Sequence, residues 1–226
     1  MSTPIVVWGA SGLARDLNEF LGDAGFTLVA LFDNDASVGS PFPGVAIYHG
    51  QDGLRTWLAQ GPRAGHAFLI AVGGDRGEER LALQTELERH GLRPATVAHP
   101  SAAIARSASI GAGTQVHALA HVGAAARIGT GCIINAGASI GHESNIGDGV
   151  HIGPGAVLCG CVTVGRSAFV GAGAVVLPRI RIGERAVVGA GAAVFGDVAA
   201  GSSVLGNPAK PLSAARIAAR SADGER

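Results

Sequence analysis

Aliphatic residues recur at every sixth position along the second half of the chain. Seventeen positions from Ile104 to Ala200 share this phase, and sixteen of them are Ile, Leu or Val. The next residue is glycine eleven times, and the residue four places after the aliphatic is usually small, as at Ala126 and Ala138. A period of six fits neither an α-helix nor the alternation of a half-buried strand. It predicts a coil of one hexad per straight segment, with aliphatic and small residues inside and glycine relieving strain at the corners.

Three hexads complete one triangular turn of this coil, so each side chain is expected above the residue eighteen places later. Turns stack at one strand spacing, roughly 4.8 Å, and the seventeen hexads therefore predict a prism roughly 27 Å long. No hexad is interrupted, so no long loop is expected to leave the prism. The alternative, a disordered linker rich in glycine and alanine, would have no reason to hold sixteen aliphatic residues in phase.

The first half of the chain alternates apolar runs with segments of helical spacing. Strands are predicted at residues 5–9, 27–32, 45–48 and 66–72. The spacing of Leu13, Leu17 and Leu21 predicts one helix, and residues 78–90 predict a second that Gly91 ends. Strands that alternate with helices favour a parallel sheet, whose ligands bind at the carboxyl ends of the strands.

The first predicted strand opens into a glycine turn at 9–12, just before the first helix. A helix N-terminus offers free amide donors and partial positive charge, which suit a phosphate group. The spacing of Gly9, Gly12 and Ala14 departs from the dinucleotide fingerprint, so a turn that merely connects strand and helix is the alternative. Asp33 lies about twenty residues further on, where a carboxylate can bind ribose. The repeat begins soon after residue 100, which leaves too little chain for a full dinucleotide fold and favours a mononucleotide-sized ligand.

Composition and charge exclude several classes of protein. The chain is 47% hydrophobic, but no stretch approaches the roughly 18–20 apolar residues that cross a bilayer. Residues 1–4 carry no sign of a signal peptide, so we expect a soluble, cytoplasmic protein without membrane insertion. The 17 basic and 17 acidic residues cancel, which argues against a nucleic-acid partner. Because aromatic residues make up only 4%, the core is expected to consist of aliphatic residues and alanine, and the three cysteines are expected to be reduced.

The uninterrupted hexads resemble the left-handed parallel β-helix of the hexapeptide-repeat acyltransferases. The left hand follows from this resemblance alone, because parallel crossovers are otherwise right-handed in about 98% of cases. The whole chain, a small Rossmann-like α/β domain followed by a β-helix, is similar to sugar O-acyltransferases and nucleotide-sugar N-acetyltransferases. The resemblance implies an α/β domain at 1–95, a linker near 96–101, a β-helix domain over 96–211 and a C-terminal helix or tail at 212–226. It also implies acetyl-CoA as co-substrate, no metal, and a homotrimer with active sites between neighbouring prisms.

The same resemblance assigns the residues that bind the two substrates. In the first domain it implies a nucleotide-sugar site at Ser11, Gly12, Asp33, Asn34 and Gly73. Leu13 departs from the family, which often has histidine at that position. In the prism it implies acetyl-CoA contacts at His151, Ala172 and Ala190. Lys210, the only lysine of the chain, is expected either to meet a CoA phosphate or to mark where the chain leaves the prism.

The hexads from Ile134 to Gly147 carry the most informative polar residues of the prism. His142 and Glu143 stand at outward positions, and Asn135 lies in the hexad before them. This pattern resembles the catalytic segment of the family, in which the histidine is the base. Acyl transfer from a thioester requires removal of a proton from the attacking amine or hydroxyl, which an imidazole accepts at neutral pH. Glu143 would orient the ring, and Gly160, eighteen residues after His142, would offer its amide to the oxyanion.

The sequence leaves several functions open. The first is acetyl-CoA-dependent N-acetylation of a nucleotide-linked amino sugar in surface-glycan biosynthesis, and the alternative is O-acetylation of a sugar of sialic-acid type. A γ-type carbonic anhydrase would need three convergent metal ligands, which His117, His121, His142 and His151 would have to supply from different positions in their hexads. The two cysteines at 159 and 161 have no evident second pair of ligands, so packing is favoured for them. A non-catalytic nucleotide-sugar scaffold would not require the polar residues at 135–151, which argues against this alternative.

Overall fold

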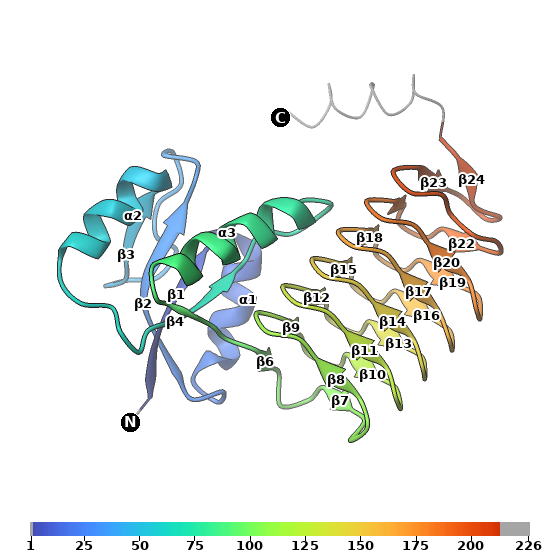
Figure 1. Cartoon of the computed structure of the whole chain (residues 1–226), viewed down its shortest axis with the longest axis horizontal. Coiled ribbons are helices and arrows are strands. Elements are labelled where there is room, and N and C mark those ends of the chain that lie inside the picture. Colours follow the sequence, from blue (N-terminus) through green and yellow to red (C-terminus); the bar gives the residue numbers. More distant parts are fainter. Residues whose placement is uncertain (1, 213–226) are drawn as a thin grey trace.

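The computed structural model describes residues 2–212, and Figure 1 shows an α/β domain beside a long coil of short strands. The first domain is a five-stranded sheet in the order β3-β2-β1-β4-β5, with every neighbouring pair parallel. Its strands are β1 (Thr3–Trp8), β2 (Phe26–Asp33), β3 (Ala46–His49), β4 (Ala67–Ile70) and β5 (Arg93–Pro94). Its helices are α1 (Gly12–Leu21), α2 (Gly50–Ala59) and α3 (Gly77–Arg89). The predicted Rossmann-like sheet is confirmed. Apart from Leu212, the predicted C-terminal helix or tail at 212–226 lies outside the described residues.

Alternate residues of the central strand β1 point to opposite faces of the sheet, and each face has its own hydrophobic core. Ile5 and Val7 pack with α1, whereas Val6 and Trp8 pack with α2 and α3. The second core contains four buried aromatic residues, namely Trp8, Phe32, Trp57 and Phe68. The expectation of a core without aromatic residues is therefore wrong for this domain, because the few aromatic side chains of the chain are concentrated in it.

Two elements of this domain escape the sequence pattern. Helix α2 contains Gly50 and Gly53, and glycine is among the weakest helix formers. Gly53 is nevertheless required, because a Cβ there would lie 2.8 Å from the backbone carbonyl carbon of Tyr48. Strand β5 has only two residues, one of them Pro94, so it has no period to detect.

The rest of the described chain forms a triangular prism with one sheet of short strands along each face. The covered face, on which the first domain rests, contains β6 (Val97–Ala98), β9 (Gln115–Val116), β12 (Ile133–Ile134), β15 (His151–Ile152), β18 (Phe169–Val170), β21 (Val187–Val188), β23 (Ser203–Leu205) and the antiparallel β24 (Lys210–Pro211). The second face contains β7 (Ala103–Ile104), β10 (His121–Val122), β13 (Ser139–Ile140), β16 (Val157–Leu158), β19 (Val175–Val176) and β22 (Ala193–Val194). The third face contains β8 (Ser109–Ile110), β11 (Arg127–Ile128), β14 (Asn145–Ile146), β17 (Thr163–Val164) and β20 (Arg181–Ile182).

Successive coils stack in parallel register eighteen residues apart, as the hexads predict. Ile134, for example, pairs with Val116 in the coil before it and with Ile152 in the coil after it. The aliphatic and small positions fill the interior, and Ile134 and Ala138 have no exposed surface. The predicted parallel β-helix is therefore confirmed.

The glycine that follows each aliphatic residue has a different role from the one expected. Gly111 and Gly123 do not have a positive φ, so these positions do not use the conformational freedom of glycine. A Cβ at Gly111 would lie 2.5 Å from the backbone of the next coil, so glycine is required there for close stacking. The left-handed backbone conformation falls two residues later in the hexad, where it is adopted by Gly113 (φ 75°) and also by Glu143 (φ 56°).

The predicted phase fails in the last coil. Val198 stacks on Ile182 and Val204 on Val188, so the register there is sixteen residues (198 − 182) instead of eighteen. Val198, not Ala200, is therefore the buried residue of this coil. Ala200 is the one member of the hexad series that is not Ile, Leu or Val, and this exception marks the shift. At the other end, β6 begins the prism within the segment expected to be a linker.

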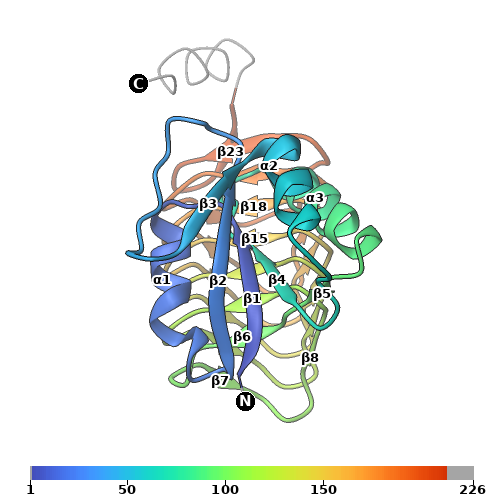
Figure 2. The ribbon, with the colours of Figure 1, turned by 90° about the vertical axis from the view of Figure 1, so that its left-hand side faces the viewer.

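The first domain rests on the covered face, and Figure 2 shows its sheet in front of strands β6, β15 and β18. Arg80 of α3 is buried between the two domains. Its guanidinium donates to the carbonyls of Val72 (2.8 Å) in the first domain and of Gly131 (3.2 Å) and Gly149 in the prism. Burial lowers the pKa of Arg80 to about 10, so the side chain stays charged at neutral pH. A buried cation bonded to carbonyls of both domains fixes their relative position.

Two edges of the prism matter for the site. The front edge joins the covered face to the second face and contains the corners at 117–120, 135–138, 153–156, 171–174 and 189–192. The far edge joins the second and third faces and contains the corners at 123–126, 141–144 and 159–162. Because the far edge does not border the covered face, it lies on the side of the prism away from the first domain (Figure 1).

Candidate functional site

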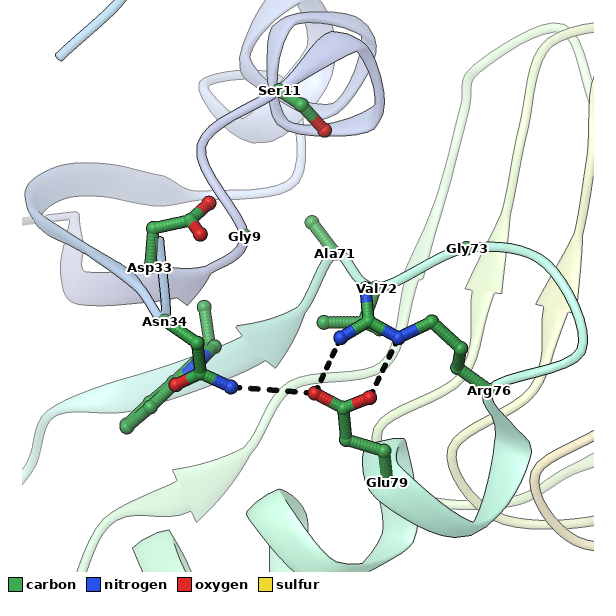
Figure 3. A pocket seen from close by; sticks show the side chains of 10 residues that line it. Gly9, Ser11, Asp33, Asn34, Ala71, Val72, Gly73, Arg76 and Glu79 are labelled. Carbon is green, nitrogen blue, oxygen red and sulfur yellow. Dashed lines mark hydrogen bonds and ion pairs between the residues drawn. The ribbon is translucent and has the colours of Figure 1, made fainter. Parts of the chain in front are cut away.

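A cavity lies at the carboxyl ends of β1, β2 and β4, where parallel sheets bind their ligands (Figure 3). We call it the sheet-edge cavity. It is lined by Trp8, Gly9, Ser11, Asp33, Asn34, Ala71, Val72, Gly73, Arg76 and Glu79. Four of the five residues predicted to bind the nucleotide sugar therefore lie together here, and the fifth, Gly12, is the first residue of α1 next to Ser11.

Close packing of the strand ends shapes this cavity. Gly9 has a φ of +104°, and a Cβ at this position would overlap the carbonyl of Ala71. The carboxylate of Asp33 braces the turn, because it accepts hydrogen bonds from the backbone N–H groups of Ala10 (2.9 Å) and Asp35 (3.0 Å). Ser11 begins α1 without a side-chain capping bond. The first-turn amides of a helix have no partner within the helix, so this end of the cavity suits an anionic group.

Two charged residues of the cavity escape the sequence analysis. Arg76 and Glu79 form an ion pair with two hydrogen bonds, of 2.6 and 2.7 Å. Glu79 also accepts a hydrogen bond from the side-chain amide of Asn34 at 3.3 Å, and Figure 3 shows the three side chains in a row. In the sequence, a pair three residues apart at the start of a helix is typical of a surface ion pair. Only the fold brings this pair to Asn34 and the cavity.

The predicted base lies on the far edge. His142 Nδ1 is 3.0 Å from Glu143 Oε2, and the two side chains are 63% and 64% exposed. The imidazole lies over Gly160 of the next coil, because a Cβ on Gly160 would come within 2.5 Å of His142 Nε2 and 2.7 Å of Cε1. The structure therefore brings His142, Glu143 and Gly160 together, with one ring nitrogen on the carboxylate and the other above the glycine.

The backbone around this group is fixed by the stacking of the coils. The N–H of Glu143 donates to the carbonyl of Ala124 in the preceding coil, and the N–H of Cys161 donates to the carbonyl of His142, each at 2.8 Å. Within residues 2–212 the N–H of Gly160 has no acceptor. The corner thus presents an oriented imidazole and, one coil away, a backbone N–H that no described residue accepts.

Asn135 and His151 lie together, but away from His142. His151 is buried against the first domain, where its Nδ1 accepts a hydrogen bond from the N–H of Gly74 at 2.8 Å and its Nε2 lies 3.2 Å from Asn135 Nδ2. Burial, reinforced by the charge of Arg80, lowers the pKa of His151 to about 3, so the ring is neutral. This placement does not support the predicted contact of His151 with acetyl-CoA, because both ring nitrogens already meet groups of the same chain.

The other predicted acetyl-CoA contacts are exposed. Ala172 and Ala190 lie one coil apart on the front edge, and the carbonyl of Ala172 accepts the N–H of Gly191 at 2.8 Å. Lys210 is exposed on β24 at the end of the prism. Within one chain, Ala172 and Ala190 therefore lie on the front edge, whereas His142, the predicted base, lies on the far edge.

The four histidines considered for a metal-dependent anhydrase do not converge. His117 is buried at the front edge and His151 on the covered face, whereas His121 and His142 are exposed on the second face and the far edge. Burial lowers the pKa of His117 to about 4. In the described part of the chain, the one group of three possible metal ligands is His142, Glu143 and Cys161, which contains a single histidine.

Comparison with protein families identifies the repeat. The family model described as bacterial transferase hexapeptide (six repeats) matches residues 143–178 and 162–196. The comparison with curated proteins found no match. Within residues 2–212, every helix is too short or too polar to span a membrane.

Several solved structures are similar over both domains. A perosamine N-acetyltransferase variant from Caulobacter crescentus, in complex with CoA and GDP-perosamine, is 31% identical with a TM-score of 0.84, covering 93% of this chain and 97% of its own. The acetyltransferase domain of PglB from Neisseria gonorrhoeae, in complex with acetyl coenzyme A, is 29% identical with a TM-score of 0.81, covering 94% and 100%. WeeI from Acinetobacter baumannii is 25% identical with a TM-score of 0.73, covering 93% and 100%.

Proposed function

Because the chain belongs to the family of hexapeptide-repeat nucleotide-sugar acetyltransferases, we propose that it transfers the acetyl group of acetyl-CoA to the amino group of a nucleotide-linked sugar. Family membership makes the chain an acyltransferase with a small α/β domain and a left-handed parallel β-helix. Similar structures contain CoA or acetyl-CoA, and those of the perosamine N-acetyltransferase also contain GDP-perosamine. They support acetyl-CoA as the co-substrate and a nucleotide-linked amino sugar as the acceptor.

The observation that carries the proposal is the imidazole of His142 held between Glu143 and Gly160. Glu143 Oε2 lies 3.0 Å from Nδ1 and can accept a proton carried there, and in that neutral tautomer Nε2, above Gly160, is the nitrogen that accepts a proton. In the proposed reaction the acceptor amine attacks the thioester carbon while Nε2 takes the amine proton. The tetrahedral intermediate then breaks its carbon–sulfur bond, and the imidazolium returns the proton to the CoA thiolate. A general base of this kind contributes roughly 10²–10⁴-fold in rate.

The backbone N–H of Gly160 is proposed as the donor that stabilises the oxyanion of the intermediate. It has no acceptor within residues 2–212, and it belongs to the residue over which the ring of His142 lies. One oxyanion donor contributes about 3 kcal/mol to transition-state stabilisation. A bare glycine leaves room for both the ring and the carbonyl oxygen.

The nucleotide part of the acceptor is proposed to bind in the sheet-edge cavity. The amides at Ser11 and Gly12 would hold the phosphates, while Asp33, Asn34 and the loop at Gly73 would contact the ribose and base. Asn135 and His151 are proposed as positioning residues. His151 accepts the N–H of Gly74, so it fixes the loop whose residue Gly73 lines the cavity.

Within one chain, the sheet-edge cavity lies next to the covered face, because its lining residue Gly73 adjoins Gly74, which donates to His151, whereas His142 lies on the far edge. We therefore propose a homotrimer in which His142 of the partner subunit lies against the front edge, close to the cavity. The groove between two prisms would then hold acetyl-CoA along Ala172 and Ala190. Lys210, at the end of this groove, would meet a phosphate of CoA.

The direct test is a panel of GDP-, UDP- and CMP-linked sugars in amino and hydroxyl forms, assayed by release of CoA thiol. We expect turnover of amino forms, with GDP-linked sugars as the first choice because a similar structure binds GDP-perosamine. His142→Ala should lower kcat by roughly 10²–10⁴-fold, and His121→Ala, which changes another exposed histidine, should not. Turnover of hydroxyl forms alone would replace this proposal with O-acetylation, and an unaffected His142→Ala enzyme would contradict the mechanism.

An acetylated nucleotide-linked sugar is an activated donor. The product of this reaction is therefore proposed to supply a glycosyltransferase in surface-glycan biosynthesis. Identification of the preferred acceptor in the panel tests this placement, because the nucleotide and sugar define which transferase can use the product.

A further inference from the structure

A third ligand-bearing side chain lies beside the proposed base. Cys161 follows Glu143 by eighteen residues, so it occupies the same corner of the next coil, and its Sγ lies 3.9 Å from Glu143 Oε2. His142 Nδ1 is 3.0 Å from the same oxygen. One ligand atom of each residue lies within 4.8 Å of the others. No step of the proposed reaction uses the thiol.

We propose that His142, Glu143 and Cys161 form a site for Zn²⁺ or a similar divalent ion, and that the bound ion inhibits the enzyme. Zinc binds imidazole nitrogen and carboxylate oxygen at about 2.0–2.2 Å and thiolate sulfur at about 2.3 Å. Tetrahedral geometry then separates nitrogen from oxygen by about 3.4 Å and sulfur from oxygen by about 3.6 Å. The observed separations of 3.0 and 3.9 Å each differ from these values by less than about half an ångström.

The ligand set and the backbone favour this class of ion. Nitrogen, oxygen and sulfur together suit zinc, whereas Mg²⁺ and Ca²⁺ require oxygen ligands. Glu143 (φ 56°) and Cys161 (φ 61°) adopt the same left-handed corner conformation, and the N–H of Cys161 is bonded to the carbonyl of His142. The backbone therefore brings the three ligand-bearing residues together before the ion arrives. All three come from one chain, so binding requires no partner subunit.

Coordination at His142 Nδ1 would stop the ring from acting as a base. A neutral imidazole carries one proton, so an ion on Nδ1 leaves that proton on Nε2, the atom proposed to accept a proton from the acceptor amine. Glu143 would bind the ion instead of the ring, and the thiol of Cys161 would lose its proton to solvent. The inhibition rests on the proposed function, whereas the metal site does not.

Cobalt binding tests the site without any substrate. Co²⁺ titrated into the purified, metal-free protein should produce a thiolate-to-cobalt charge-transfer band that saturates at one ion per chain. Cys161→Ser should abolish the band, and Cys159→Ser, which changes the other partly exposed cysteine, should retain it. Ser167 occupies the same kind of corner with φ 55°, so serine is compatible with the backbone at 161. Absence of the band in the unaltered protein, or its persistence in Cys161→Ser, would overturn the proposal.

Zinc inhibition then tests the consequence for turnover. The acetylated sugar is measured by mass spectrometry, because thiol reagents would react with Cys161 and zinc would bind free CoA. Zn²⁺ should inhibit the unaltered enzyme and Cys159→Ser alike, while Mg²⁺ should not. Changes outside the first coordination shell already cost about 10–100-fold in metal affinity, so Cys161→Ser should need at least about tenfold more zinc for half-inhibition. Equal zinc inhibition of Cys161→Ser and the unaltered enzyme would overturn the inhibitory role of the bound ion. A cobalt band in a protein that acetylates no sugar would refute only the proposed function and leave the metal site standing.

Discussion

Replacing Gly160 with alanine tests whether the imidazole of His142 acts from the position that the structure gives it. The new methyl group would lie 2.5 Å from His142 Nε2 and 2.7 Å from Cε1. Nonbonded heavy atoms need roughly 3.5 Å, so the ring must move by about 1 Å. A displacement of this size typically costs about 10²-fold in rate, which corresponds to about 2.7 kcal/mol of activation free energy.

The same substitution should leave folding nearly unchanged. Gly160 has no positive φ, and Ala124, two coils away on the far edge, shows that alanine fits the equivalent corner. Moving an exposed ring away from its preferred rotamer costs about 0.5–1.5 kcal/mol. Replacing glycine with alanine at a compatible site returns about 0.4–1 kcal/mol by restricting the unfolded chain. The net change in the free energy of unfolding is therefore close to zero.

Steady-state kinetics and thermal unfolding together give the answer. We expect Gly160→Ala to lose about 10²-fold in kcat while its Tm stays within a few degrees of the unaltered protein. Gly196→Ala is the matched control, because a Cβ there meets nothing within 4 Å. A Gly160→Ala enzyme with unchanged kcat would refute the reasoning, since the observed ring position would then have no bearing on proton transfer.

Three further predictions concern residues that hold the site in place. Glu143→Gln removes a carboxylate bonded to the ring, an interaction worth about 1.5–3 kcal/mol, so kcat should fall roughly 10–100-fold, and an unchanged kcat would contradict the orienting role. Arg80→Met leaves buried carbonyls of both domains unpaired, so urea unfolding should show a free energy of unfolding lower by on the order of 3 kcal/mol. Arg80→Lys should recover part of this loss, and an unchanged free energy of unfolding in Arg80→Met would contradict the role of the interface. His151 has a pKa of about 3 in the folded chain, below its ordinary value of 6.5, so the unfolded chain binds a proton first on acidification and stability falls as pH drops below 6.5. Between pH 7.5 and 5, protonation of His151 in the unfolded chain should lower the free energy of unfolding by roughly 2 kcal/mol. Urea unfolding at both pH values should therefore show a smaller pH dependence in His151→Asn than in the unaltered protein.

The fold is largely predictable because the prism imposes one strict rule on the sequence. An interior position every six residues admits only aliphatic or small side chains, so the regular spacing of residues such as Ile134 and Ala138 is enough to reveal the coil. The register shift at Val198 does not follow from this rule, because the last coil is two residues shorter and still places an apolar residue inside. The aromatic core of the first domain is missed because composition averages over two domains that are built differently.

The candidate site is predictable only where stacking arithmetic applies. His142 and Gly160 are eighteen residues apart, so their juxtaposition follows from the repeat alone. His151 also belongs to the repeat, but its burial depends on the first domain, which docks on the covered face through contacts such as that of Gly74. The pairing of Arg76 with Glu79 next to Asn34 likewise depends on how strands and helices meet in space, which local sequence patterns do not contain.

Mixed oligomers of two inactive variants test the central claim that each site is shared between two chains. His142→Ala removes the base and keeps the sheet-edge cavity, whereas Asp33→Ala removes the brace of the cavity and keeps the base. If each site joins the cavity of one chain to His142 of the partner subunit, equal mixing by unfolding and refolding should restore about a quarter of the full activity, because one pairing in four combines two intact halves. If cavity and base belong to the same chain, the mixture will be as inactive as either variant alone.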